Sequence, residues 1–190
     1  MRLIDTHSHL FLEEFSEDLP QVIERARSAG VTHIFMPNID STTIDSMLSV
    51  CNTYNDYCFP MIGLHPTSVN ADYEKELEIV ARELRSFNKY IAIGEVGMDL
   101  YWDKTFLKEQ QIVLDKQINW ALEYDLPVVI HCRDAFGYIY NVLEPYKNTS
   151  LKGVFHSFTG TDDEAARILE FSGFLIGING VVTFKKSRLP

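Results

Sequence analysis

The chain repeats one unit, a short apolar run followed by an amphipathic stretch, and this repeat limits the possible folds more than any other feature. The apolar runs are rich in Val and Ile and are bounded by Gly, Pro or Asn, which is typical of buried parallel strands. The expected strands are Arg2–Thr6, Val31–Met36, Tyr57–Gly63, Tyr90–Gly94, Leu126–Ile130, Lys152–Phe155 and Gly173–Ile178. Such a series predicts an α/β fold with a parallel sheet.

Helical periodicity fills the segments between these strands. Apolar residues recur at the spacing that places them on one face of a helix. The stripes are Leu19, Val22, Ile23 and Ala26; Ile44, Met47, Leu48 and Cys51; Leu77, Val80, Ala81 and Leu84; Leu114, Ile118, Ala121 and Leu122; Ile139, Val142 and Leu143; and Ile168 with Leu169. We therefore expect helices that alternate with the strands.

Two architectures suit this alternation, an open doubly wound sheet and a TIM-type (β/α)8 barrel. An open nucleotide-binding sheet usually has a Gly-rich loop after its first strand, whereas this first strand runs into His7-Ser8-His9. Polar residues of the kind that bind ligands end several different strands, which is typical of the barrel. A barrel typically takes about 250 residues, and the chain has 190. We therefore expect a single partial barrel domain over residues 1–190, with about seven strands and without the eighth.

Histidine and glutamate side chains end several of the expected strands. His7 and His9 follow the first strand two residues apart, so their side chains share one face at a spacing of about 7 Å. Glu95 ends the fourth strand, His131 the fifth and His156 the sixth. Taken alone, each is more simply explained as a hydrogen-bonded residue at a strand end. Because a parallel barrel brings all five to one rim, together they predict a divalent-metal site.

This set of ligands predicts a metal-dependent hydrolase. Imidazole and carboxylate suit zinc, iron, manganese or nickel, and the Glu95 carboxylate is able to bridge two ions. Two neighbouring ions clamp the attacking and leaving oxygens of a displacement and generate hydroxide near neutral pH. Glu95 is therefore the predicted catalytic residue. Asp5 shares the face of His7, where it is expected to accept a hydrogen bond from a ligand imidazole.

Four further residues near the expected rim are candidates for substrate contacts. His65 ends the third strand, where it contacts substrate phosphate or caps a turn. Arg133 follows His131, and its guanidinium group grips phosphate or pairs with the neighbouring aspartate. Ser157 donates to phosphate or caps the next helix. Tyr101 stacks on an unpaired base or packs on a neighbouring helix.

Composition narrows the class of partner and the compartment. The net charge of −10 disfavours long phosphate contacts along a nucleic acid but is compatible with one metal-charged point of contact. No apolar run reaches the roughly 18–20 residues that a membrane span needs, and the N-terminus has no signal-peptide pattern. Cys51, Cys58 and Cys132 form no CxxC pair, which favours reduced thiols. We expect a cytoplasmic monomer without a membrane partner.

Five motifs resemble those of the TatD family of metal-dependent deoxyribonucleases, which lies within the amidohydrolase-like barrels. The motifs are Ile4–Leu10, Gly63–Pro66, Gly94–Asp99, Val129–Ala135 and Phe155–Gly160. The resemblance extends from Met1 to about Lys186. One motif alone is a weak signal, but five in this order and spacing are specific.

The resemblance implies a two-metal phosphodiesterase that degrades DNA from the 3′ end. One ion would be held by His7, His9 and Glu95. The second would be held by Glu95, His131 and His156, so that Glu95 bridges the pair. The ions implied are zinc, magnesium or manganese, and the substrate is single-stranded DNA or the 3′ ends of strands.

Two other functions stay open at this point. One is a barrel hydrolase of C–N or C–O bonds, such as an amidase or deacylase, which uses the same metal-activated water. Glu95, at a position where many amidohydrolases have a carbamylated lysine, favours the TatD family instead. The other is a catalytically impaired fragment that binds metal or a partner. In the family pattern a metal-binding aspartate ends the eighth strand, and because the chain stops at Pro190 before one, we expect a truncated chain with weak or absent catalysis.

Overall fold

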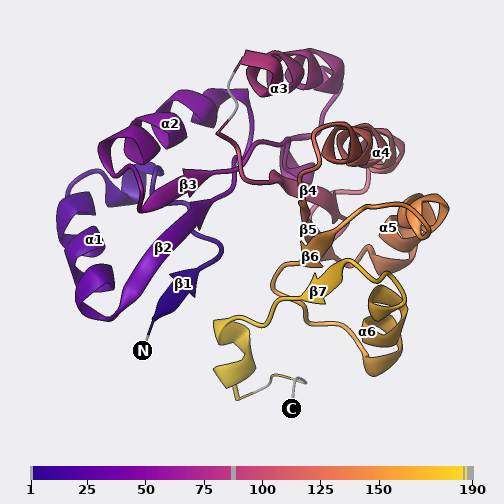
Figure 1. Cartoon of the computed structure of the whole chain (residues 1–190). Coiled ribbons are helices and arrows are strands. Elements are labelled where there is room, and N and C mark those ends of the chain that lie inside the picture. Colours follow the sequence, from indigo (N-terminus) through magenta and orange to yellow (C-terminus); the bar gives the residue numbers. More distant parts are fainter. Residues whose placement is uncertain (1, 87–88, 186, 188–190) are drawn as a thin grey trace.

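The computed structural model describes residues 2–86, 89–185 and 187, and these form the expected parallel strands (Figure 1). The strands are β1 (Leu3–Asp5), β2 (Val31–Met36), β3 (Cys58–Pro60), β4 (Ile93–Asp99), β5 (Val128–Arg133), β6 (Gly153–Phe155) and β7 (Phe174–Ile176). Two parallel sheets have the strand orders β1-β2-β3 and β4-β5-β6-β7. A parallel bridge between Ile62 and Ile93 joins them. The strands therefore follow one another in chain order, as the repeat predicts.

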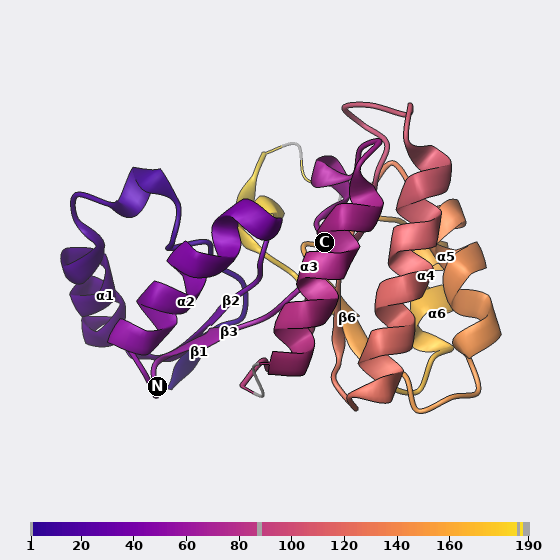
Figure 2. The same cartoon turned by 90° about the horizontal axis from the view of Figure 1, so that it is seen from above.

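Helices connect these strands and lie on the outer side of the curved strand layer, as Figure 1 and Figure 2 show. The α-helices are α1 (Leu19–Ser28), α2 (Ile44–Thr53), α3 (Tyr73–Ser86), α4 (Leu107–Glu123), α5 (Phe136–Leu143) and α6 (Asp162–Leu169). The 3-10 helices are η1 (Glu13–Phe15), η2 (Ser41–Thr43), η3 (Pro66–Ser68), η4 (Glu144–Tyr146) and η5 (Gly180–Thr183). The predicted βα alternation is confirmed.

The core lies where the apolar faces of the helices meet the strands. Leu114 and Ile118 on α4, for example, are completely buried, as are Ile93 on β4 and Ile130 on β5. Because side chains alternate along a strand, a second, smaller cluster forms on the other face of the strands. Its buried members are Met61, Ala92 and Val129. Burial on both faces explains why the strands read as continuous apolar runs.

The predicted strand boundaries were wrong at several places. The fourth strand was expected to end at Gly94, but β4 runs from Ile93 to Asp99 and all its residues are buried. The fifth strand likewise continues past Ile130 to Arg133, whereas β1 and β3 are shorter than expected. These predicted strands end just before the first ligand-type polar residue. β4 nevertheless continues through two carboxylates, because hydrogen bonds from distant residues compensate for their burial.

β1 and β7 lie at the two ends of the strand series, and each has one hydrogen-bonded neighbouring strand among the described residues. Both carry exposed apolar side chains, with Ile4 52% exposed on β1 and Leu175 69% exposed on β7. Within the described part of the chain, no helix is long and apolar enough to cross a membrane. The single-domain assignment over residues 1–190 stays a prediction, and it includes residues 1, 87, 88, 186 and 188–190, which lie outside the described residues.

Candidate metal centre

The carboxylate of Glu95 is the centre of a cluster of histidines. Glu95 Oε2 lies 3.0 Å from His7 Nε2, and 3.7 Å from both His9 Nε2 and His65 Nε2. Glu95 Oε1 lies 3.0 Å from His131 Nδ1. The carboxylate is therefore surrounded by four imidazole nitrogens that come from three different segments of the chain.

Asn38, which no sequence motif singles out, fixes the backbone at Glu95. The Asn38 N–H donates to the Gly94 carbonyl at 3.1 Å, and the Glu95 N–H donates to the Asn38 carbonyl at 3.2 Å. The Asn38 side chain is fully buried and donates to the Gly63 carbonyl at 2.9 Å. Asn38 thus connects the ends of β2 and β3 to β4, at the point where the β4–β5 register is irregular.

The environment of Glu95 keeps its carboxylate charged. Glu95 is only 3% exposed, and burial by itself disfavours the ionised form. Hydrogen bonds from the four histidines, led by His131, outweigh burial and hold the pKa of the Glu95 carboxyl well below its usual value of 4.5. A charged carboxylate among imidazoles is the form that binds a cation.

The nitrogen and oxygen atoms form two close groups, and both contain Glu95. One contains His7, His9 and Glu95, the other His65, Glu95 and His131, and within each group the ligand atoms lie within 4.8 Å of one another. Imidazole and carboxylate are common ligands of zinc and of other first-row divalent ions. Glu95 belongs to both groups, so its carboxylate is the part that they share. The residues therefore fit the metal chemistry predicted from the sequence.

His156 lies against the first of these groups. Its ring stacks on the His7 ring, with 3.4 Å between centroids and 11° between planes. Burial, followed by the charge of His7, lowers the pKa of His156 from 6.5 to about 4, so the ring is neutral at pH 7 and has a lone pair for an ion. His156 is not in either close group of ligand atoms, and its expected place in the second site stays a prediction.

Asp99 is a second buried carboxylate at the centre, and it has no role among those predicted from the sequence. It is 3% exposed, and its Oδ2 lies 2.9 Å from His131 Nε2. The side chain of Gln110 bonds both the Asp99 N–H and the Asp99 carbonyl. The signal that could have revealed Asp99 is its spacing, since residues four apart on one strand share a face, and Glu95 lies four residues before it.

His65 presents a hydrogen-bond donor to the centre. The Thr67 N–H donates to His65 Nδ1 at 3.2 Å, so in the neutral ring the proton is on Nε2, the nitrogen that faces Glu95. The residue also caps η3. A ring that carries its proton towards the site donates a hydrogen bond to an oxygen atom instead of binding an ion.

Arg133 and Tyr101 form one cluster at the rim. The Arg133 guanidinium lies 3.8 Å from the centre of the Tyr101 ring and 5.2 Å from that of Trp102. These aromatic rings are 54% and 72% exposed. The sequence suggested two roles for Arg133, a phosphate contact and a pair with the next aspartate. The structure shows a further contact, because the guanidinium stacks on aromatic rings.

Two expected side-chain roles were wrong in detail. Asp5 accepts a hydrogen bond from the backbone N–H of His7 at 3.1 Å and not from an imidazole. The alternative role of Ser157 as a helix cap belongs instead to Thr161, which forms a capping box with Glu164. The hydroxyl of Ser157 accepts a hydrogen bond from the Asn179 amide, and its substrate contact stays a prediction.

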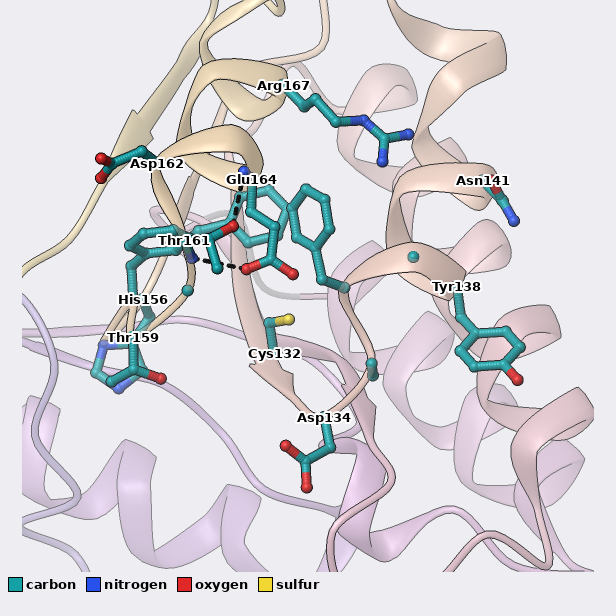
Figure 3. Close-up of a pocket in the computed structure, with 16 residues that line it drawn as sticks. Cys132, Asp134, Tyr138, Asn141, His156, Thr159, Thr161, Asp162, Glu164 and Arg167 are labelled. Carbon is teal, nitrogen blue, oxygen red and sulfur yellow. Dashed lines mark hydrogen bonds between the residues drawn. The ribbon is translucent and has the colours of Figure 1, made fainter. Parts of the chain in front are cut away.

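A pocket of about 880 Å³ lies beside the metal centre, between α5 and α6 (Figure 3). His156 belongs to its lining, which connects the pocket to the centre. Phe136, Phe155 and Phe158 contribute aromatic surface, and Arg167 contributes a cation. The volume is that of a small-molecule site.

Comparison with known proteins gives concordant matches over nearly the whole chain. The model of the "TatD related DNase" family matches residues 4–189. An uncharacterized metal-dependent hydrolase of Bacillus subtilis, YabD, is 35% identical over 188 residues, which are 99% of this chain and 72% of that protein. The 3′-5′ ssDNA/RNA exonuclease TatD of Pantoea ananatis is 31% identical over 180 residues, 95% and 68% of the two chains. The crystal structure of the Escherichia coli TatD homologue YjjV is 31% identical, with a TM-score of 0.89 over 100% of this chain and 75% of that one.

Proposed function

The chain belongs to the TatD-related DNase family, and on this basis we propose that it is a 3′–5′ exonuclease that hydrolyses phosphodiester bonds in DNA with two divalent ions. Membership makes it a metal-dependent hydrolase with the barrel-type α/β fold of that family. The observation that carries the proposal is the convergence of four imidazoles on the buried carboxylate of Glu95. The Pantoea relative, a single-strand exonuclease by name, supports the choice of substrate.

The ligands divide into two sets in this proposal. His7, His9 and Glu95 would hold one ion, while Glu95, His131 and His156 would hold the second. When bound, ions of zinc, magnesium or manganese polarise the phosphate and lower the pKa of water, so that hydroxide is available near neutral pH. Glu95 keeps both sets together, since one of its oxygens faces His7 and the other faces His131.

Other residues of the chain bind and orient the substrate. The Nε2–H of His65 donates to a phosphate oxygen, because Nδ1 already accepts the Thr67 N–H. The cluster of Arg133 and Tyr101 binds the strand near its end, with the cation for phosphate and the exposed ring for an unpaired base. Ser157 donates to phosphate as well. Because the net charge is −10, these local contacts suit a strand end better than a long duplex.

The test is metal-supplemented cleavage of single-stranded DNA labelled at either end. We expect Mg²⁺, Mn²⁺ or Zn²⁺ to support removal of nucleotides from the 3′ end, and His131→Asn to abolish it. His33→Asn is a matched control, because His33 lies at the start of β2 and its ring contacts Thr32 and Phe59, away from the centre.

The outcomes separate the possible functions. Equal cleavage by the wild type and His131→Asn would overturn the proposal. The absence of cleavage by a wild-type protein that binds both ions would also overturn it, and would favour the catalytically impaired fragment that the sequence leaves open. Hydrolysis of amide or lactone substrates in place of DNA would assign the centre to C–N or C–O bond chemistry.

A further inference from the structure

The ring of His131 lies between two buried carboxylates, one at each ring nitrogen. Only one of these carboxylates, that of Glu95, belongs to the predicted set of metal ligands. Its Nδ1 is 3.0 Å from Glu95 Oε1, and its Nε2 is 2.9 Å from Asp99 Oδ2. Glu95 is the shared ligand of the two groups of ligand atoms, whereas Asp99 belongs to neither group among the described residues. The two carboxylates therefore have different relations to the ring.

A neutral imidazole has one proton and one lone pair, and only the nitrogen with the lone pair binds an ion. A carboxylate next to one nitrogen holds the proton there and leaves the lone pair on the other nitrogen. Asp99 faces Nε2 from the side away from Glu95. With the proton on Nε2, Nδ1 is left to bind an ion beside the Glu95 carboxylate. Without an ion, a ring that carries both protons donates to both carboxylates.

We propose that Asp99 is a positioning residue, which accepts the Nε2 proton of His131 as a hydrogen bond and thereby makes Nδ1 the metal-binding atom. The inference rests on the proposed two-metal centre. It adds a residue outside the predicted ligand set and a definite tautomer for one ligand.

Asp99 is itself held firmly in place, as a positioning residue must be. Its other oxygen, Oδ1, accepts the backbone N–H of Tyr101 at 3.1 Å. The Gln110 amide bonds the Asp99 backbone on both sides, at 2.9 Å and 3.2 Å. Rotation of the carboxylate away from His131 would break the bond to Tyr101 and leave buried polar groups without partners, which is costly.

His65, which belongs to the same group of ligand atoms as His131, differs from it in the position of the ring proton. Its ring is next to that of His131, with 4.6 Å between the centroids, yet the Thr67 N–H donates to its Nδ1. The proton of His65 is therefore on the nitrogen that faces Glu95, whereas that of His131 is on the nitrogen that faces away. Opposite tautomers thus make one ring a donor for oxygen atoms and the other a metal ligand.

Asp99→Asn tests the proposal with little change in shape. If the amide NH₂ faces His131, it donates to Nε2 and drives the proton to Nδ1. If the amide is reversed, its NH₂ faces the Tyr101 N–H, which is also a donor. Asp103→Asn is a matched control, because Asp103 Oδ1 likewise accepts a backbone N–H two residues ahead, from Thr105.

Two readouts are needed, and neither depends on the substrate. Long-range ¹H–¹⁵N NMR of the protein saturated with Zn²⁺, a diamagnetic ion, reports which ring nitrogen of His131 keeps its proton; its signals are assigned by their loss in His131→Asn. We expect an Nε2 proton in the wild type and Asp103→Asn, and an Nδ1 proton in Asp99→Asn. Calorimetric titration with Mn²⁺ should show affinity for one ion about 10- to 100-fold weaker in Asp99→Asn, with the other ion unchanged.

Several results would overturn the inference. An Nδ1 proton on His131 in the wild type would do so without any variant, even if Asp99→Asn failed to fold. Unchanged binding of both ions by Asp99→Asn, or an equal loss in Asp103→Asn, would also refute it. A wild type that binds both ions and shows the expected tautomer but cleaves no DNA would refute the proposed nuclease function and support the role of Asp99.

Discussion

The N-terminal sheet, β1–β3, provides its histidines from the loops that follow its strands, whereas the C-terminal sheet, β4–β7, provides Glu95 and His131 from the strands themselves. Figure 2 shows the two parts side by side, with α1 and α2 around the first and α4–α6 around the second. Every residue of β4 is buried, and every residue of β1 is exposed. Glu95, on the buried strand β4, is thus held more firmly than His7 and His9, which follow the exposed strand β1.

Hydrogen bonding follows the same division. Both ring nitrogens of His131 face carboxylates, while the buried Nδ1 atoms of His7 and His9 have no hydrogen-bond partner among the described residues. A ligand imidazole is usually oriented by a bond from its second nitrogen. The comparison indicates that β4 and β5 form the firmly held side of the proposed metal centre, and that the loop after β1 is the less constrained side.

Glu95→Gln should have the largest effect, because Glu95 is the one residue that both groups of ligand atoms share. A neutral amide cannot hold two cations, so we expect loss of both ions and a fall in hydrolysis of about 10³-fold or more, the equivalent of several kcal/mol. Calorimetric titration with Mn²⁺ and an initial-rate assay measure the two effects. A variant that retained one tightly bound ion would show that the loop after β1 has a site of its own.

Gly97→Ala should have the next largest effect, on folding. Gly97 has a φ of +136°, and an added Cβ would collide with the His131 carbonyl oxygen, so the contact between β4 and β5 would have to open. We expect a loss of about 3 kcal/mol or more in the free energy of unfolding, measured by urea denaturation.

The control for this experiment is Gly137→Ala on α5, where an added Cβ meets no atom within 4 Å. It should stabilise the protein by up to about 1 kcal/mol, because alanine favours the helix. Equal effects of the two changes would show that the β4–β5 pair is not the rigid part of the molecule.

The pH dependence of metal-free stability should reveal His156. Burial, and then the charge of His7, lowers its pKa from 6.5 to about 4 in the folded protein, so the unfolded chain takes up the proton first as the pH falls. The stability that comes from the neutral ring is present above pH 6.5 and is lost between 6.5 and about 4.

The measurement is the difference between wild type and His156→Asn across this range. We expect the wild type to lose about 1–3 kcal/mol more than the variant, an amount that allows for solvent screening of a half-buried ring. Thermal melts at several pH values determine it. Parallel curves would mean that His156 is not held neutral against His7.

The sequence predicts the order of the strands and helices because local periodicity encodes both. It also identifies Glu95 and the histidines, since ligand-type residues follow apolar runs. The sequence does not predict a role for Asp99, because its partner His131 lies 32 residues away and the expected strand ends at Gly94. The stacking of Arg133 on Tyr101 is also a contact between distant residues, which periodicity does not contain.

The smallest expected effect compares one substitution in both sheets. Ile93→Val removes a methyl group from β4, where Ile93 is completely buried, and Ile4→Val does the same on β1, where Ile4 is 52% exposed. We expect a cost of about 1 kcal/mol for the first, which leaves a small cavity, and less than about 0.5 kcal/mol for the second. Urea denaturation of both variants gives the two values. A cost for Ile4→Val as large as that for Ile93→Val would mean that β1 is covered in solution, and the N-terminal sheet would then be as firmly held as its C-terminal counterpart.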